Sequence, residues 1–243
     1  MSRFSAAGIH LAISFVIFVG LAYLIVFEWY PGIFFDTDGG WRGMRIIVAV
    51  DMVLGPLLTL VVYKHGKPGL KTDLTLIALL QAVCLTAGTY VVYSERPISV
   101  VYVDGRITVM SGDDYRAAGL EVPDMSIYPG DAPRWVMVDV PQEIEAQADF
   151  RTAMFKARKP LNIAIEHYIP FSTTHPQFTL NPLDQSIILA RDEGPAEMTR
   201  WVTRHGGKPA DYNFYLFTTR YIYKYAGFNQ AGELLGFLAL QPH

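Results

Sequence analysis

The most unusual stretch of this sequence is an apolar run that contains a carboxylate, a glycine and a proline. Asp51 lies among the aliphatic residues of the run 44–63, and Gly55 and Pro56 follow one helical turn later. An ionisable side chain in the middle of a membrane-spanning helix costs about 2.5–3.5 kcal/mol, so it usually faces protein or water and marks a function. Because Pro56 cannot donate a backbone hydrogen bond to the carbonyl of Met52, we expect the helix to kink there.

Two interpretations of Asp51 remain open from the sequence. In the first, the carboxylate has a partner within the chain, such as Gln81, a hydroxyl group or an arginine that reaches inward. In the second, Asp51 faces a groove for another helix, and Gly55 lets that helix approach closely. His10 and Ser14 lie one turn apart in an earlier apolar run and could line the same groove.

The sequence contains no established catalytic or metal-binding motif. Its six histidines form neither an HExxH pattern nor a cluster with cysteine, and the single cysteine, Cys84, lies in an apolar run. The nucleophile motif Gly-x-Ser-x-Gly and the P-loop pattern do not occur. Ser111, His167 and an aspartate could be combined into a triad, but a chain of this length commonly offers such a combination. We therefore expect no catalytic residue, no metal site and no cofactor.

Three apolar helices in residues 1–93 are expected to position the intramembrane polar groups. The runs 6–27, 44–63 and 74–93 are about as long as the roughly 20 residues that cross a bilayer. The first run exceeds the apolar core of a signal peptide and ends in FEWYP instead of a small-residue cleavage site. It is therefore predicted to be an uncleaved span. Tyrosines and tryptophans near the ends of the runs are typical of the aromatic belts of membrane proteins.

The loops between the apolar runs predict the orientation of the protein. The second loop, residues 64–73, contains three lysines and one aspartate, whereas the first, EWYPGIFFDTDGGWRG, contains three acidic residues and one arginine. Short loops rich in Lys and Arg remain in the cytoplasm. We therefore expect a cytoplasmic N-terminus, a cytoplasmic loop 64–73, and residues 94–243 in the periplasm of a bacterium.

Residues 94–243 have the pattern of one α+β domain. Asp104-Gly105 between two β-rich runs predicts a hairpin, because a type I′ turn needs positive φ at both central residues. An amphipathic helix is predicted over 141–158, with Pro141 near its first turn. Its apolar positions are Ile144, Phe150, Met154 and Phe155. The remaining predicted strands are 135–140, 161–169, 212–225 and 232–240, and the remaining predicted helices are 184–189 and 195–204.

Charge and composition exclude one class of partner. The chain has 20 Lys and Arg against 23 Asp and Glu, a formal net charge of −3, and no dominant basic patch. Nucleic-acid binding is therefore not expected. Hydrophobic residues make up 51% of the chain, which agrees with a membrane-spanning part.

The first loop and the second apolar run resemble a known family. FDTDGGWRGMRIIVAVDMVLGPLLTLVVYK, followed by a short basic loop and KTDLTLIALLQ, is similar to the type IV pilin accessory proteins of the TfpX/TfpZ family. The residues that carry the resemblance are Gly39, Gly40, Trp41, Gly43, Asp51, Leu54, Gly55 and Pro56. The C-terminal segment GELLGFLALQP is similar mainly in its position.

This resemblance implies a bacterial inner-membrane protein that acts like a chaperone for type IV pilin and supports pilin stability, assembly or pilus dynamics. The expected partner is the major pilin, with pilus inner-membrane assembly proteins as a second possibility and membrane lipid around the spans. The candidate partner-binding residues are Asp51, Gly55, Pro56, Gly39, Gly40, Trp41 and Arg42. The alternatives are a regulator bound to the assembly machinery and, less favoured, a membrane-anchored periplasmic enzyme.

Overall fold

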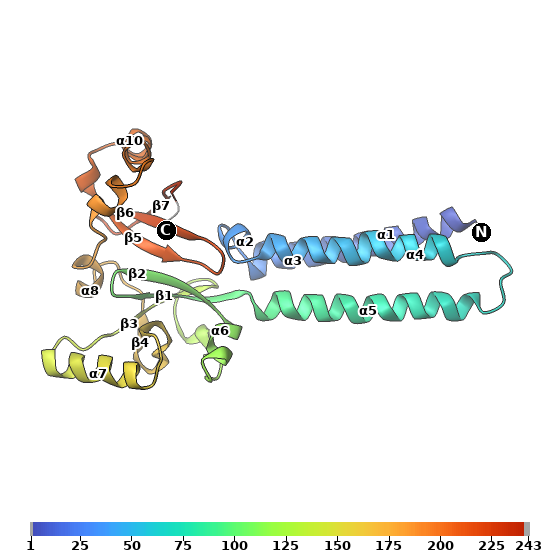
Figure 1. The fold of residues 1–243 in the computed structure, drawn as a ribbon, viewed down its shortest axis with the longest axis horizontal. Coiled ribbons are helices and arrows are strands. Elements are labelled where there is room, and N and C mark those ends of the chain that lie inside the picture. Colours follow the sequence, from blue (N-terminus) through green and yellow to red (C-terminus); the bar gives the residue numbers. More distant parts are fainter. Residues whose placement is uncertain (1, 241–243) are drawn as a thin grey trace. The chain divides into compact units, whose positions relative to one another are not determined.

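The structure is a computed structural model that describes residues 2–240 (Figure 1). By the contacts within the chain, it divides between Arg96 and Pro97 into two compact units. The last residues of the domain predicted over 94–243, residues 241–243, lie outside the described residues. The α+β class predicted for the second unit and the three apolar helices predicted for the first are both confirmed.

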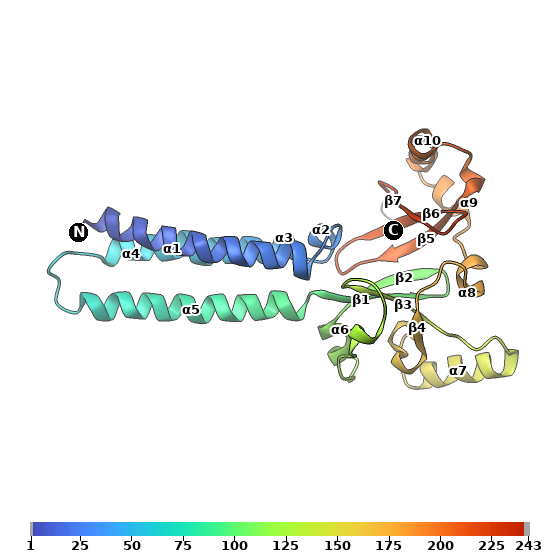
Figure 2. The same ribbon diagram turned by 180° about the vertical axis from the view of Figure 1, so that it is seen from behind.

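The first unit contains three helices that are long and apolar enough to cross a membrane: Arg3–Trp29, Gly40–Val62 and Leu70–Ser94. The first consists of α1 (Arg3–Tyr23) and a π-helical segment (Leu24–Trp29); the second of α3 (Gly40–Ile47), a π-helical segment (Val48–Leu54) and α4 (Gly55–Val62); the third is α5 (Leu70–Ser94). The short α2 (Phe34–Thr37) lies in the first loop. Both views show α5 running alongside α1 and α4 (Figures 1 and 2).

The middle helix widens before its proline. Pro56 lacks the N–H that an α-helix would direct to Met52, and a π-helical segment ends at Leu54, two residues before it. In such a segment the N–H groups bond five residues back instead of four. The helix therefore continues through Gly55-Pro56 as far as Val62.

The second unit is built on one mixed seven-stranded sheet with the order β4-β3-β1-β2-β5-β6-β7. Its strands are β1 (Pro97–Val103), β2 (Arg106–Ser111), β3 (Arg134–Val138), β4 (Tyr168–Pro170), β5 (Tyr212–Thr218), β6 (Tyr223–Asn229) and β7 (Leu234–Phe237). The pairs β1–β3 and β2–β5 are parallel, and all the other neighbours are antiparallel. The helices are α6 (Gly112–Ala117), α7 (Ile144–Lys156), α8 (Pro176–Thr179), α9 (Gln185–Leu189) and α10 (Gly194–His205), with 3₁₀ turns at Met125–Ile127, Leu161–Ile163, Ile165–His167 and Pro209–Asp211.

The hairpin predicted at Asp104-Gly105 is confirmed. Both residues have positive φ, 49° and 74°, and Val103 pairs with Arg106 across the turn. These angles give the backbone the twist that a two-residue hairpin loop requires. The hairpin places β1 and β2 at the centre of the sheet.

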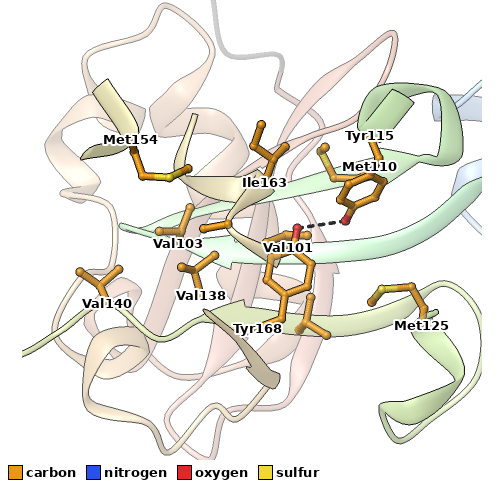
Figure 3. Close-up of a cluster of buried hydrophobic side chains, with 12 residues drawn as sticks. Val101, Val103, Met110, Tyr115, Met125, Val138, Val140, Met154, Ile163 and Tyr168 are labelled. Atoms are coloured by element: carbon orange, nitrogen blue, oxygen red, sulfur yellow. Dashed lines mark hydrogen bonds between the residues drawn. The ribbon is translucent and has the colours of Figure 1, made fainter. Parts of the chain in front are cut away.

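Alternate residues of β1 face two different sets of buried side chains. Val101 and Val103 belong to a cluster with residues of β2, β3, α6 and α7 (Figure 3). Tyr102 points the other way and contacts Phe178, with ring centroids 5.0 Å apart. Both faces of this central strand are therefore covered, as the two-residue period of a strand allows. A separate cluster joins α9 and α10 to β5 and β6.

Two predicted strands differ from the structure. Residues 161–169 form two 3₁₀ turns, and only Tyr168–Pro170 is a strand. The consecutive residues Ile163 and Ala164 are both buried, which a strand with one face to a core does not permit. Residues 212–225 form two strands joined by a turn, in which the N–H of Thr219 bonds the carbonyl of Ile222.

The apolar face predicted for the helix over 141–158 is wrong at two of its four positions. Met154 is buried, but Ile144 and Phe155 are 85% and 83% exposed. Phe150 and Met154 lie four residues apart on one face of α7. Ile144 does not share that face, because it lies six residues before Phe150, a rotation of about 240° around the helix. Phe155 lies one residue after Met154 and is rotated from it by about 100°.

Candidate functional site

Asp51 is buried in the π-helical segment of the middle helix, with 4% of its surface exposed. The amide Nε2 of Gln81 on α5 donates a hydrogen bond to its Oδ1 over 3.3 Å. Its other oxygen, Oδ2, is buried and has no hydrogen-bond partner among the described residues. The structure thus contains the contact with Gln81 that the first interpretation expected.

Gly55 makes the contact between Asp51 and Gln81 possible. A Cβ atom at Gly55 would lie 1.8 Å from Nε2 of Gln81, so the Gln81 amide occupies the space that a larger residue would need. Pro56 is half-buried beside it. The surface that Gly55 offers to another helix is therefore covered by α5 of the same chain.

A second polar contact joins the middle helix to α1. His10 and Thr59 lie with Nδ1 and Oγ1 2.7 Å apart, and Ser14, one turn beyond His10, is buried. Asp51, Gly55 and Thr59 follow one another at four-residue intervals, a spacing that turns the face of the helix by only about 40° per step. This face therefore meets both neighbouring helices of the chain.

The candidate residues of the first loop shape the start of the middle helix. Gly39 precedes the helix with φ of 106°, a conformation that favours glycine. A Cβ on Gly40 would lie 2.7 Å from the Phe35 ring, so the chain folds tightly there. Trp41 and Arg42 are both exposed, and the guanidinium of Arg45 lies 5.3 Å from the centroid of the Trp41 ring. The loop residues thus lie at one end of the helix, apart from Asp51.

An open groove between α1 and α5 was missed by the sequence analysis. It has a volume of about 480 Å³ and is lined by Ile17, Leu21, Trp29, Leu85, Thr86, Thr89, Tyr90 and Tyr93. The sequence contained one signal of it, two threonines in an otherwise apolar stretch of the third run. Which helices leave a gap between them is a property of the packing.

The residues considered for a catalytic triad have structural contacts in the second unit. Ser111 caps α6: its Oγ accepts from the N–H of Asp114, whose carboxylate bonds back to the N–H of Ser111. The ring of His167 lies 4.6 Å from that of Phe150. Both residues thus have structural contacts within the second unit.

Buried tyrosines of the second unit form a small hydrogen-bond network. The hydroxyl of Tyr115 lies 3.0 Å from the hydroxyl of Tyr168 (Figure 3). It also lies 2.7 Å from Oγ of Ser99. Burial raises the pKa of Tyr115 and that of Tyr168 above the usual value for tyrosine. The tyrosines therefore stay neutral and join the sheet to the turns beside it.

Comparison with known proteins identifies three relatives from Dichelobacter nodosus. "Fimbrial assembly protein, serogroup E1" and "Fimbrial assembly protein, serogroup I" are each 35% identical to this chain over 111 residues, which is 44% of this chain and 43% of each relative. "Fimbrial assembly protein, serogroups C1 and C2" is 33% identical over 111 residues, which cover 84% of that protein. The chain belongs to the fimbrial assembly protein family.

The relatives support a family related to fimbrial assembly. They do not distinguish the TfpX/TfpZ proteins, which the sequence resembles, from other proteins of fimbrial assembly. The matched region spans less than half of the length of the serogroup E1 and serogroup I proteins. No family model and no solved structure matches the chain.

Proposed function

We propose that this protein is a membrane-anchored accessory protein of type IV pilus biogenesis that binds the pilin and supports its stability or assembly. The observation that carries the proposal is the kinship with the three fimbrial assembly proteins. The three helices able to span a membrane and the separate α+β unit agree with a membrane-anchored accessory protein, as the resemblance to the TfpX/TfpZ proteins implies.

The proposed location is the bacterial inner membrane, with the N-terminus in the cytoplasm and the second unit in the periplasm. The support is the excess of lysine in the loop between the second and third helices, which contains Lys64, Lys67 and Lys71. Fibre subunits that are anchored in the same membrane would meet both units of the protein there.

The proposed role is non-catalytic. Ser111 and His175 accept hydrogen bonds from backbone N–H groups at the starts of α6 and α8, so each has a structural reason for its position. A binding role requires surfaces instead of convergent reactive groups. A regulator bound to the inner-membrane assembly machinery remains the alternative to a pilin-binding protein.

The test is deletion of the gene in its host together with purification of a tagged copy from detergent extracts. We expect the deletion strain to lose surface fibres in electron micrographs, and we expect the tagged protein to copurify with the major pilin. A tagged membrane protein with no role in pili serves as the control. Copurification of assembly-machinery proteins without pilin would favour the regulator, and normal fibres with no fimbrial protein recovered would contradict both.

A further inference from the structure

The groove between α1 and α5 remains unfilled by the chain itself. Both helices contact the middle helix. They meet each other at one end, where the rings of Trp29 and Tyr93 lie edge to face with centroids 5.2 Å apart and the Tyr30 hydroxyl donates to the Val92 carbonyl over 2.7 Å. Next to this contact, the groove of about 480 Å³ between the two helices is open to the surroundings.

A second hollow continues the groove along α5. It has a volume of about 520 Å³ and is lined by Ala82, Val83, Thr86, Ala87 and Tyr90. Thr86 and Tyr90 line both spaces. Small side chains such as those at 82, 86 and 87 allow the backbone of another helix to approach closely in a membrane.

Two hydroxyl groups of the groove wall have no hydrogen-bond partner among residues 2–240. Neither Thr86 nor Thr89 makes a side-chain hydrogen bond among the described residues. Threonines in helices often bond their own backbone, as Thr199 and Thr203 do on α10, where Oγ1 lies 2.8 Å from the carbonyl four residues earlier. The hydroxyls of Thr86 and Thr89 are instead available to a group outside the chain.

The position of these hydroxyls limits what can cover them. Thr86 lies eight residues before the end of α5, which is about 12 Å along the helix axis. At that depth a membrane offers lipid chains or another helix, because irregular backbone does not occur in contact with lipid. Lipid chains have no hydrogen-bonding groups there, whereas a helix can bring a polar side chain.

We propose that the groove between α1 and α5 is the docking site for one transmembrane helix of a partner protein. The partner helix is apolar and carries a polar side chain that pairs with Thr86 or Thr89. The assignment of that partner to the fimbrial apparatus rests on the proposed function. The proposal also moves the partner surface from Asp51 and Gly55, which Gln81 covers, to the residues of α5 that line the groove toward α1.

The direct test is photocrosslinking in living cells with the full-length protein. A photoreactive residue replaces Leu21 or Thr89 in the groove, and Val53 or Val61, both exposed on the middle helix, serves as the control position. We expect the groove positions to give adducts to a transmembrane peptide of another protein, identified by mass spectrometry, and the control positions to give adducts to lipid. Lipid adducts alone at all four positions would overturn the docking site.

A pair of matched variants tests the role of the hydroxyls. Thr86→Val keeps the shape of the groove and removes one hydroxyl, and Thr75→Val makes the same change at an exposed position near the other end of α5. With the crosslinker at Leu21 and limiting partner, we expect about a threefold lower yield in Thr86→Val, since one hydrogen bond between membrane helices has about that effect. We expect no change in Thr75→Val. Equal yields in the two variants would overturn hydroxyl recognition at Thr86.

The identity of the adduct separates this inference from the proposed function. An adduct from the groove to a fimbrial protein supports both. An adduct to a membrane protein unrelated to fimbriae supports the docking groove and contradicts the proposed function. Lipid adducts alone in the groove, combined with copurification of pilin, overturn the groove and leave the proposed function standing.

Discussion

Two glycines of the middle helix set how closely α5 can approach it. Gly43 faces Val92 and Gly55 faces Gln81, and a Cβ atom at either position would overlap its neighbour. Such close approach through small residues is the usual way in which helices associate in membranes, where lipid competes for apolar surface. The two contacts are therefore expected to be sensitive to the addition of one methyl group.

Gly43→Ala should destabilise the first unit. The added Cβ would lie 2.4 Å from Cγ2 of Val92, whose branched side chain is stiff about χ1. Overpacking of this kind costs about 1–3 kcal/mol, which exceeds the gain of about 1 kcal/mol from replacing glycine by alanine in a helix. We expect a lower thermal midpoint of the protein in detergent. Gly20→Ala, where no atom lies within 4 Å of the new Cβ, should leave the midpoint unchanged or raise it, and equal effects of the two variants would refute the packing argument.

Asp51→Asn should leave accumulation and fibre assembly close to normal. The asparagine carbonyl can still accept the hydrogen bond from Gln81, and the volume hardly changes. Asp51→Leu should lower the amount of protein in the membrane, because an unpaired buried amide costs about 1–3 kcal/mol. Immunoblots of membranes and counts of surface fibres measure both variants. Normal accumulation of Asp51→Asn with complete loss of fibres would instead show that Asp51 serves a partner.

Caps and turns at the ends of elements organise the second unit. The bidentate pair between Arg151 of α7 and Asp104, with distances of 2.6 and 2.9 Å, ties the helix to the hairpin turn. The reciprocal bonds of Ser111 and Asp114 satisfy two backbone N–H groups at the start of α6. The capping pair and the Asp104-Gly105 turn involve neighbouring residues and have recognisable sequences, and for that reason the hairpin was predictable.

The buried tyrosines of the sheet should make the second unit sensitive to alkaline pH. Burial raises the pKa of Tyr102 to about 12, and it also raises that of Tyr115 and Tyr168, whereas unfolded tyrosine titrates near 10. Below about pH 10 both states keep these protons, so the stability does not depend on them. Between about pH 10 and 12 the unfolded chain loses protons that the folded unit retains, so stability falls as pH rises.

Tyrosinate absorbance and circular dichroism, recorded together against pH, measure this effect in the full chain. We expect part of the tyrosinate signal to appear only as the β-sheet signal is lost. Tyr102→Phe should reduce the loss of stability between about pH 10 and 12. Complete titration of all tyrosines near pH 10 with the sheet intact would contradict the prediction.

At the scale of the whole molecule, the two units differ in how much of their apolar surface is exposed. In the most apolar windows of the three long helices, only 11–22% of the residues are buried, so most of their apolar surface needs a lipid environment or another helix. The second unit buries its apolar residues in clusters of its own. One chain thus combines three helices that are able to span a membrane with a second unit that has its own buried core.

The proposed orientation in the membrane gives a further prediction. An alkaline phosphatase reporter, active only outside the cytoplasm, should be active when fused after residue 240 and inactive when fused within the loop at Gly66. The physical reason is that short loops rich in Lys and Arg, like the loop 64–73, remain in the cytoplasm. Whole-cell phosphatase activity is the measurement, with immunoblots to correct for the amount of each fusion. The reverse pattern would show that the charge bias does not set the topology.

Features that depend on neighbouring residues could be predicted from the sequence. The three apolar helices follow from the length of the runs, and the turn at Asp104-Gly105 follows from its backbone preferences. The strand predicted over 161–169 failed, because its apolar residues serve two compact turns with a similar composition. Ile144 and Phe155 were apolar yet exposed, because the sheet beneath α7 reaches only one of its faces.

The sequence by itself determined that the chain has three membrane-length helices and a separate α+β part, since runs of apolar residues and local turn preferences act over short distances. Only the tertiary structure decided which of several possible partners Asp51 takes, because Gln81 lies 30 residues away on another helix. It also decided the parallel pairing of β2 with β5 and the groove between α1 and α5. These features depend on contacts between segments that are far apart in the sequence, and no local sequence pattern specifies such contacts or the gaps between packed helices.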